Sequence, residues 1–292
     1  MDLAAAPIDF TFGIASGVLY VPFHQGETLR DGLEITTPFP DYVQNKSYSA
    51  QIVGPGSNER NEAFVALAGD RNRGFGSALT GADGTMEVGV FNEIRDRSYW
   101  AAISRSYMTI KNNTDVEIDF DFFYEIEAGE LAVRGIRSDR TARARIEATI
   151  DYVLLTPNGG TYDETTGNLL HYFAGIEFDN FLTHSSNAIV TLKQRDTFNL
   201  VYGTEKLKGN FPLPTIPAYG QLTYYYDLFS TLNVQRFEIG GHARIGDPTD
   251  LVGGGSFRLV QASDAAVPEP STMLLVSAGF IAALARHRKR NA

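Results

Sequence analysis

The sequence predicts an all-β protein, an antiparallel β-sandwich of the jelly-roll type, followed by a single C-terminal transmembrane helix. Three observations predict this. Apolar and polar residues alternate with a period of two over many short segments. Gly, Pro, Asn and Asp separate these segments, as they do in β-turns. The composition then changes sharply after the polar linker that ends at Val267, where a Pro-rich stretch leads into an apolar run.

The alternation is clearest in two segments that both carry charge. In residues 115–122 every second residue is acidic, and in residues 142–151 arginine and acidic residues alternate with Ala and Ile. Because neighbouring side chains of a strand point to opposite faces, each segment should bury one face and expose the other. Sequential strands tend to be neighbours. We therefore expect both polar faces on the same side of one sheet, with at least one arginine near an acidic partner.

Other segments fit strands, turns or, in one case, a helix. Further strand candidates are residues 86–91, 107–110, 152–155, 169–176, 188–192, 198–201, 222–228, 233–239 and 255–260. Turns are expected at 82–84, 157–160, 163–168 and 247–250. Residues 61–68 are the one weak helix candidate within the β-rich part.

Charge and cysteine usage narrow the function class. Residues 263–292 carry a net charge of +2, so the rest of the chain carries −12. Such an acidic body repels polyanions, which predicts no nucleic-acid partner. The chain has no cysteine, which excludes disulfides, Cys-ligated zinc and thiol nucleophiles.

The C-terminal segment has three parts in a fixed order. Pro268, Glu269 and Pro270 should stay extended, because proline fixes φ and lacks a backbone donor. Residues 271–285 form the expected membrane helix, about 22 Å long against a hydrocarbon core of ~30 Å. Its apolar anchor residues are Met273, Leu274, Leu275, Val276, Phe280, Ile281 and Leu284. Arg286, Arg288, Lys289 and Arg290 follow, and the positive-inside rule places this basic stop-transfer cluster in the cytoplasm.

This order of Pro-Glu-Pro, short apolar helix and Arg-rich tail resembles the PEP-CTERM sorting signal. The resemblance implies an exosortase-type processing enzyme that recognises Pro268, Glu269 and Pro270, cleaves near them and removes the anchor. It further implies an inner-membrane stage, with membrane lipid around the anchor and the body on the periplasmic side. The cell surface or extracellular matrix would be the destination. The resemblance covers only the end of the chain.

The expected organisation follows from these parts. Residues 1–6 are the remnant of a signal peptide, because Ala4, Ala5 and Ala6 fit the small-residue box of a cleavage site. We expect the basic and apolar parts of that signal upstream of Met1. Residues 7–262 form the β-sandwich body, and 263–270 form the linker with the sorting motif. Residues 271–285 form the transmembrane helix, and 286–292 the cytoplasmic tail.

The body carries no motif that identifies a catalytic residue, a metal site or a cofactor. None of the five histidines has metal-ligand spacing to another, and phosphate-binding and hydrolase motifs are missing from the sequence. Arg134, Arg137, Arg140, Arg143 and Arg145 indicate a charged face that the acidic strand balances; the alternative is docking of an acidic polysaccharide.

These observations favour a non-enzymatic surface or matrix protein over two other functions. The first alternative is a carbohydrate-binding module acting on exopolysaccharide, because Tyr224, Tyr225 and Tyr226 could present flat rings to a sugar. The second is a polysaccharide hydrolase using two carboxylates, for which the acidic residues offer no preferred pair.

Overall fold

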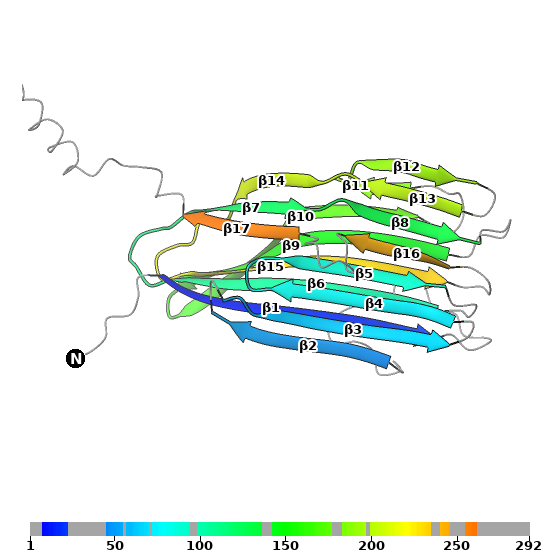
Figure 1. Ribbon diagram of the computed structural model, residues 1–292. Coiled ribbons are helices and arrows are strands. Elements are labelled where there is room, and N and C mark those ends of the chain that lie inside the picture. The colour runs from blue at the N-terminus through cyan, green and yellow to red at the C-terminus, as the bar shows by residue number, and fades with distance from the viewer. Residues whose placement is uncertain are drawn as a thin grey trace, which may run out of the picture.

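The computed structural model describes residues 8–22, 45–54, 57–69, 72–93, 98–135, 142–176, 183–196, 199–234, 240–245 and 255–261. In these ranges the chain forms β-strands and turns and no helix, which confirms the all-β prediction (Figure 1). The expected transmembrane helix lies outside the described residues.

The strands assemble into two antiparallel sheets. The first sheet has the order β11-β10-β9-β15-β6-β1-β2. Its strands are β1 (Ile8–Pro22), β2 (Asn45–Val53), β6 (Ser98–Asn112), β9 (Ala142–Asn158), β10 (Thr161–Ile176), β11 (Thr183–Ser186) and β15 (Gln221–Val234). Four long strands, β1, β6, β15 and β9, pair along nearly their full length and form its centre.

The second sheet is built partly from interrupted strands. Its members are β3 (Arg60–Gly69), β4 (Asn72–Gly81), β5 (Met86–Asn92), β7 (Phe120–Ile126), β8 (Gly129–Arg134), β12 (Val190–Arg195), β13 (Asn199–Thr204), β14 (Leu207–Pro212), β16 (Gly240–Ile245) and β17 (Gly255–Gln261). β8 pairs with β13 and β16, whereas β7, two residues before β8, pairs with β14 and β17. Thus β7 and β8 act as one long strand with a break. β13 and β14 form a second interrupted strand beside it, with β13 paired to β8 and β14 paired to β7.

The two sheets pack face to face over a core rich in aromatic residues. β1 packs against β3 and β4, and β15 packs against β5 and β16. The fully buried side chains include Trp100, Tyr172, Tyr224, Tyr226 and Phe122. The Phe122 ring stands edge-on to the rings of Tyr224 and Tyr226, with centroids 5.0 and 6.3 Å away. Such edge-to-face contacts join β7 of one sheet to β15 of the other.

A small hydroxyl cluster also joins the sheets inside the core. Thr80 on β4 lies 3.0 Å from the hydroxyl of Ser16 on β1 and 2.7 Å from that of Ser104 on β6. Ser16 donates to the Asn61 carbonyl and Ser104 to the Leu79 carbonyl, each over 2.7 Å. Each of the three hydroxyls is therefore satisfied, as buried polar groups need to be.

Most strand candidates are confirmed, and two local predictions are wrong. Residues 61–68 belong to β3, where Asn61, Ala63 and Val65 are buried while Glu62 and Phe64 are exposed. The exposed Phe64 hid this period of two. Residues 163–168 lie within β10 and pair with β9. The turn predicted at 157–160 is confirmed at Gly159 and Gly160. The turn at 82–84 is confirmed, and the one at 247–250 lies outside the described residues.

The two charged segments do not share a sheet, contrary to the prediction. β9 lies in the first sheet, whereas β7, which contains the end of the acidic segment, lies in the second. Residues 115–119 precede β7, and Ile118 makes only an isolated bridge to Ile216. After β6 the chain crosses from the first sheet to the second, and it returns before β9. β7 and β9 therefore lie in different sheets although they are close in sequence. Arg145 does have an acidic partner, Glu147, on its own strand.

Candidate functional site

The outer face of the first sheet carries a transverse row of residues from six strands. Ile52 on β2 pairs with Gly13 on β1, and Gly13 pairs with Tyr107 on β6. Tyr107 pairs with Tyr225 on β15, and the row continues through Asp151 on β9 to Asn168 on β10. Such direct cross-strand neighbours have Cβ atoms about 5 Å apart. The row therefore places two tyrosines beside a carboxylate and an amide.

Alternation decides which tyrosine of the 224–226 triplet can meet a ligand. Tyr224 and Tyr226 are fully buried in the core, and burial raises the pKa of both phenols. Tyr225 points the other way and is half-buried on the outer face. Its ring centroid lies 6.3 Å from that of Tyr107. Of the triplet, Tyr225 is therefore the one ring that can face a sugar, and the second ring, Tyr107, comes from β6.

Gly13 allows Tyr107 to lie flat against the sheet. A Cβ added at Gly13 would lie 2.1 Å from the Tyr107 ring, closer than real atoms approach. A glycine inside a strand is a signal of such a close approach, but it does not say which residue approaches, so the sequence alone does not point to Tyr107.

Arg105 and Asp227 form an ion pair with two hydrogen bonds beside this row. The guanidinium donates two hydrogen bonds to the carboxylate, of 2.7 and 2.6 Å. Arg105 also lies over the Tyr225 ring, 5.4 Å from its centroid. Burial raises the pKa of Asp227 and the Arg105 contacts oppose this, while the carboxylates of Asp151 and Glu147 raise it further. Because 122 positions separate the partners, no local sequence pattern could predict the pair.

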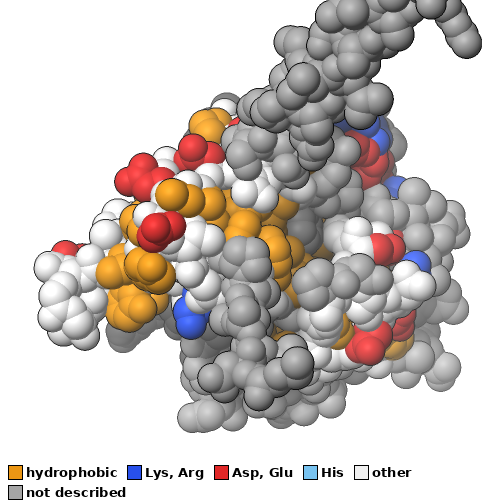
Figure 2. Space-filling model, turned by 90° about the vertical axis from the view of Figure 1, so that its left-hand side faces the viewer, with side chains coloured by type: hydrophobic (Ala, Val, Ile, Leu, Met, Phe, Trp, Pro, Cys, Tyr) orange, Lys and Arg blue, Asp and Glu red, His pale blue; other side chains and the backbone are white. Residues whose placement is uncertain are grey.

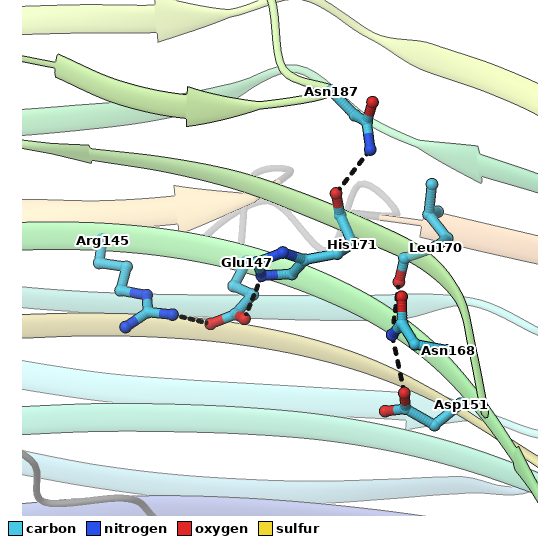
Figure 3. Close-up of polar contacts among 7 residues, drawn as sticks. All are labelled: Arg145, Glu147, Asp151, Asn168, Leu170, His171 and Asn187. Carbon is cyan, nitrogen blue, oxygen red and sulfur yellow. Dashed lines mark hydrogen bonds and ion pairs between the residues drawn. The ribbon is translucent and has the colours of Figure 1, made fainter. Parts of the chain in front are cut away.

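A second polar cluster extends along β9 and β10 (Figure 3). Glu147 accepts a 2.6 Å hydrogen bond from Arg145 and lies 2.7 Å from Nε2 of His171. Asn168 donates to Asp151 over 2.7 Å. Arg145 also covers the Phe173 ring at 4.6 Å. The predicted balance by the acidic strand is wrong for Arg145, whose acidic partner Glu147 lies on β9 itself. Arg134 lies on β8 of the second sheet, 4.0 Å from Glu93, and Arg137 and Arg140 lie outside the described residues.

The outer face of the second sheet has a ladder of three phenylalanines. Phe75 stacks on Phe91 at 5.3 Å and on Phe64 at 6.4 Å. Beside the ladder lies a hollow of about 160 Å³, lined by Glu62, Ala63, Phe64, Ser77, Ala78, Leu79 and Glu87. Across the sheet, His242 lies 2.8 Å from Glu130, which Lys193 also contacts at 3.0 Å. Burial lowers the pKa of His242 although Glu130 opposes this shift.

No group of three or more metal-ligating side chains lies together in the described part of the chain. His171 and His242 each contact a single carboxylate there. In the same ranges no helix is long and apolar enough to cross a membrane.

The sorting residues predicted from sequence lie beyond the described chain. Pro268, Glu269, Pro270, the apolar anchor residues and the basic cluster all follow Gln261, the last residue of β17. A profile of the PEP-CTERM protein-sorting motif matches residues 266–289. The chain carries a PEP-CTERM sorting motif. This motif implies processing by an exosortase-type enzyme and transit through the membrane to the cell surface or extracellular space.

Two solved structures show a weak similarity to the chain. No curated protein matches the chain. The membrane-inserted form of the Clostridium perfringens NetB toxin is 8% identical, with a TM-score of 0.13 over 70% of this chain and 98% of the toxin chain. The VP2 subviral particle of infectious bursal disease virus is 9% identical, with a TM-score of 0.08 over 96% of this chain and 73% of the viral chain.

Proposed function

We propose that this is an exported surface or extracellular-matrix protein, held transiently in the inner membrane by residues 271–285 and released by an exosortase. Its β-sandwich body has no enzymatic role in this proposal and faces the periplasm before release. The observation that carries the proposal is the PEP-CTERM match at residues 266–289, which begins five positions after the last strand ends.

The order of segments suits this sequence of events. Residues 262–270 can span about 30 Å when extended, because each residue adds at most ~3.5 Å. The two prolines favour such an extended form, which leaves Pro268, Glu269 and Pro270 open to an enzyme at the membrane surface. The basic cluster holds the far end of the anchor in the cytoplasm. Cleavage near the prolines would then separate the folded body from the anchor and from the basic cluster.

Replacement of Pro268-Glu269-Pro270 by three alanines tests the proposal in the native host. We expect the variant to stay in the membrane fraction with Arg286–Arg290 still attached, whereas the wild type loses them. Mass spectrometry of the mature C-terminus measures this. Replacing Ser263-Asp264 by two alanines in the same linker is the matched control and should be processed normally. A wild-type protein that keeps Arg286–Arg290 at its destination would refute the proposal.

Carbohydrate binding is a second candidate function, and the Tyr107–Tyr225 pair favours it. Two neighbouring rings beside Asp151 and Asn168 combine an apolar surface with hydrogen-bonding groups that could meet sugar hydroxyls. The ligand class would be the neutral repeat of an exopolysaccharide. Arg105 and Asp227 would hold Tyr225 from the side, because the guanidinium contacts both.

Calorimetric titration of the protein with exopolysaccharide from its own host tests this candidate. Tyr225→Ala should weaken binding about tenfold, as expected for the loss of an aromatic contact. Tyr162→Ala is the matched control, because Tyr162 is exposed on the β9–β10 hairpin and outside the row. Equal binding by the wild type and Tyr225→Ala would remove this face as the sugar site.

A further inference from the structure

Exposed apolar side chains gather at one end of the sandwich. Phe10, Val116 and Tyr219 are 41%, 59% and 56% exposed. β1 begins at this end, the 113–119 loop connects β6 to β7 there, and the 213–220 loop leads into β15. Figure 2 looks onto this end and shows hydrophobic side chains gathered between acidic ones. An apolar surface of this kind, rimmed by polar groups, indicates an interaction site.

Asn112 holds the two loops at this end together. It is fully buried, and its side-chain amide donates to the carbonyls of Val116 and Pro217 over 2.7 and 2.9 Å. Its side-chain oxygen accepts from the Thr114 backbone N–H at 3.0 Å. The Tyr219 N–H in turn donates to the Thr114 carbonyl over 3.1 Å. Val116 and Tyr219 are therefore presented by backbone that is already ordered.

Tyr219 has a backbone conformation that does not suit its side chain. Its φ is +56°, in the left-handed region that glycine occupies without strain. Asn187 is the other non-glycine residue with positive φ among the described residues, and asparagine tolerates this conformation well. A tyrosine in this conformation lowers the stability of the fold, and its exposed ring buries little apolar surface in return. Such local strain is found where a side chain serves function.

The chain leaves the body at this same end. Gln261, the last residue of β17, pairs with Phe120 at the start of β7, and β17 points to the end where β1 begins (Figure 1). Only residues 262–270 separate it from the apolar anchor segment, a span of at most about 30 Å. β9 alone has 17 residues, so the sandwich is about 55 Å long. The end that bears Phe10, Val116 and Tyr219 is therefore the one tethered close to the membrane.

We propose that this end is a bilayer-contacting surface, in which Phe10, Val116 and Tyr219 lie against the lipid interface while the chain is anchored. The inference rests on the proposed anchoring by residues 271–285. Tyrosine and phenylalanine suit the interface, where an apolar ring can enter and a polar group can stay hydrated. Only a few side chains take part, so the contact is weak without the tether. The tether supplies the high local concentration that makes it effective, and cleavage of the anchor ends it.

The charges around the surface define the lipid it prefers. Asp115, Glu117 and Asp119 are exposed in the same loop as Val116. They would be repelled by anionic headgroups, at distances shorter than about a Debye length of ~10 Å. The surface therefore fits a zwitterionic bilayer better than an anionic one.

Site-specific labelling of the full chain tests the proposal, and the absence of native cysteine makes single labels possible. Glu117→Cys, which is exposed next to Val116 and leaves the three apolar side chains in place, reports on the near end. Glu93→Cys reports on the far end, because Glu93 is exposed directly after β5, at the end of the sandwich away from the anchor. Each labelled chain is reconstituted in phosphatidylcholine vesicles that contain a headgroup quencher, and flotation first measures membrane retention. We expect both chains to float and the near-end label alone to be quenched strongly.

The outcomes separate this inference from the anchoring proposal. If the chains do not float, anchoring by residues 271–285 is wrong and the bilayer contact is wrong with it. If they float and both labels are quenched equally, or neither is, the anchor stands and the bilayer-contacting end is refuted. Quenching that disappears on dilution of the protein per vesicle would show contact with a second copy, which also refutes it.

A variant of Tyr219 tests the contact without endangering the fold. Tyr219→Gly relieves the unfavourable φ, so the protein should fold at least as well as the wild type. Near-end quenching should nevertheless fall about tenfold in the double variant Tyr219→Gly/Phe10→Ser, because the apolar area at the interface is lost. Phe64→Ser is the matched control, since Phe64 is 61% exposed but lies on the outer face of the second sheet. An equal effect of both variants would refute the proposal.

Discussion

Arg105 on β6 and Asp227 on β15 face each other across directly paired positions, and two hydrogen bonds of 2.7 and 2.6 Å join them. The Asp227 side chain is 4% exposed and the Arg105 side chain 29%. The carboxylate of Asp227 is thus removed from water, whereas the guanidinium of Arg105 is still partly exposed to water. A buried charge of this kind depends strongly on its partner, because its desolvation is otherwise uncompensated.

Removal of Arg105 should therefore destabilise the protein. We expect Arg105→Leu to lower the free energy of unfolding by about 3 kcal/mol at neutral pH, since the Asp227 carboxylate stays buried without its cation. Urea unfolding followed by far-UV circular dichroism measures the change. The double variant Arg105→Leu/Asp227→Asn is the control and should recover most of the loss. A loss below 1 kcal/mol in the single variant would show that the pair contributes little.

The effect of Arg105→Leu should also depend on pH. Burial raises the pKa of Asp227 above its ordinary value of 3.8, although the contacts with Arg105 lower it. Stability linked to a raised pKa is fully present below the unfolded value and is lost as pH rises through the folded value. Without Arg105 the folded pKa rises further, so the deficit of the variant should be smallest near pH 4 and grow toward pH 7. A deficit independent of pH would contradict this.

Gly13→Ala should disturb the Tyr107–Tyr225 pair. The new methyl group would meet the Tyr107 ring at 2.1 Å, so the ring has to move away from the sheet. We expect a stability loss of about 1–3 kcal/mol, as for overpacking, and weaker exopolysaccharide binding if the row is the sugar site. Gly54→Ala is the control, because a Cβ there meets nothing within 4 Å. Thermal unfolding and titration of both variants measure the two effects.

The hydroxyl of Thr80 should stabilise the contact between the sheets. Thr80→Val keeps the shape but removes the group that meets both Ser16 and Ser104. We expect a loss of about 1–3 kcal/mol, since two buried hydroxyls lose a partner. Thr80→Ser retains the hydroxyl and should lose clearly less. Denaturant titration compares the two, and a Thr80→Val variant as stable as Thr80→Ser would exclude a role for the hydroxyl.

Asn112 should keep the two loops of the bilayer-contacting surface well ordered. Asn112→Ala removes the donor to the Val116 and Pro217 carbonyls and the acceptor for Thr114. Hydrogen exchange should then accelerate in residues 113–119 and 213–220 while β9 stays protected. Asn113→Ala is the control, because Asn113 contacts the Asp9 side chain near the surface over 2.7 Å. Unchanged exchange in both loops would show that other contacts order them.

Much of the strand content was predictable because it rests on local alternation. Residues 86–91 and 222–228 fall inside β5 and β15, and the parity of Tyr224, Tyr225 and Tyr226 was implicit in the period of two. The errors occurred where a local pattern was ambiguous. Phe64 faces solvent, so residues 61–68 lacked a clean alternation, and the polar residues 163–168 resemble a turn although they pair with β9.

The sorting motif was also evident from sequence, because its recognition depends on the linear order of Pro268-Glu269-Pro270, an apolar run and basic residues, and not on a folded surface. The candidate site on the body was not evident. Gly13, Tyr107 and Tyr225 lie on three strands far apart in the chain, and pairing alone makes them neighbours.

By itself, the sequence determined the β-strand character of the body, its acidity and its C-terminal sorting motif, since each is a property of neighbouring residues. Only the tertiary structure decided that β7 and β9 belong to opposite sheets, that Arg105 meets Asp227, and that Phe10, Val116 and Tyr219 share the end where β17 exits. The physical reason is that strand order depends on which apolar faces pack together over the whole core. Arg105 and Asp227, for example, are 122 positions apart, and no local pattern records their contact.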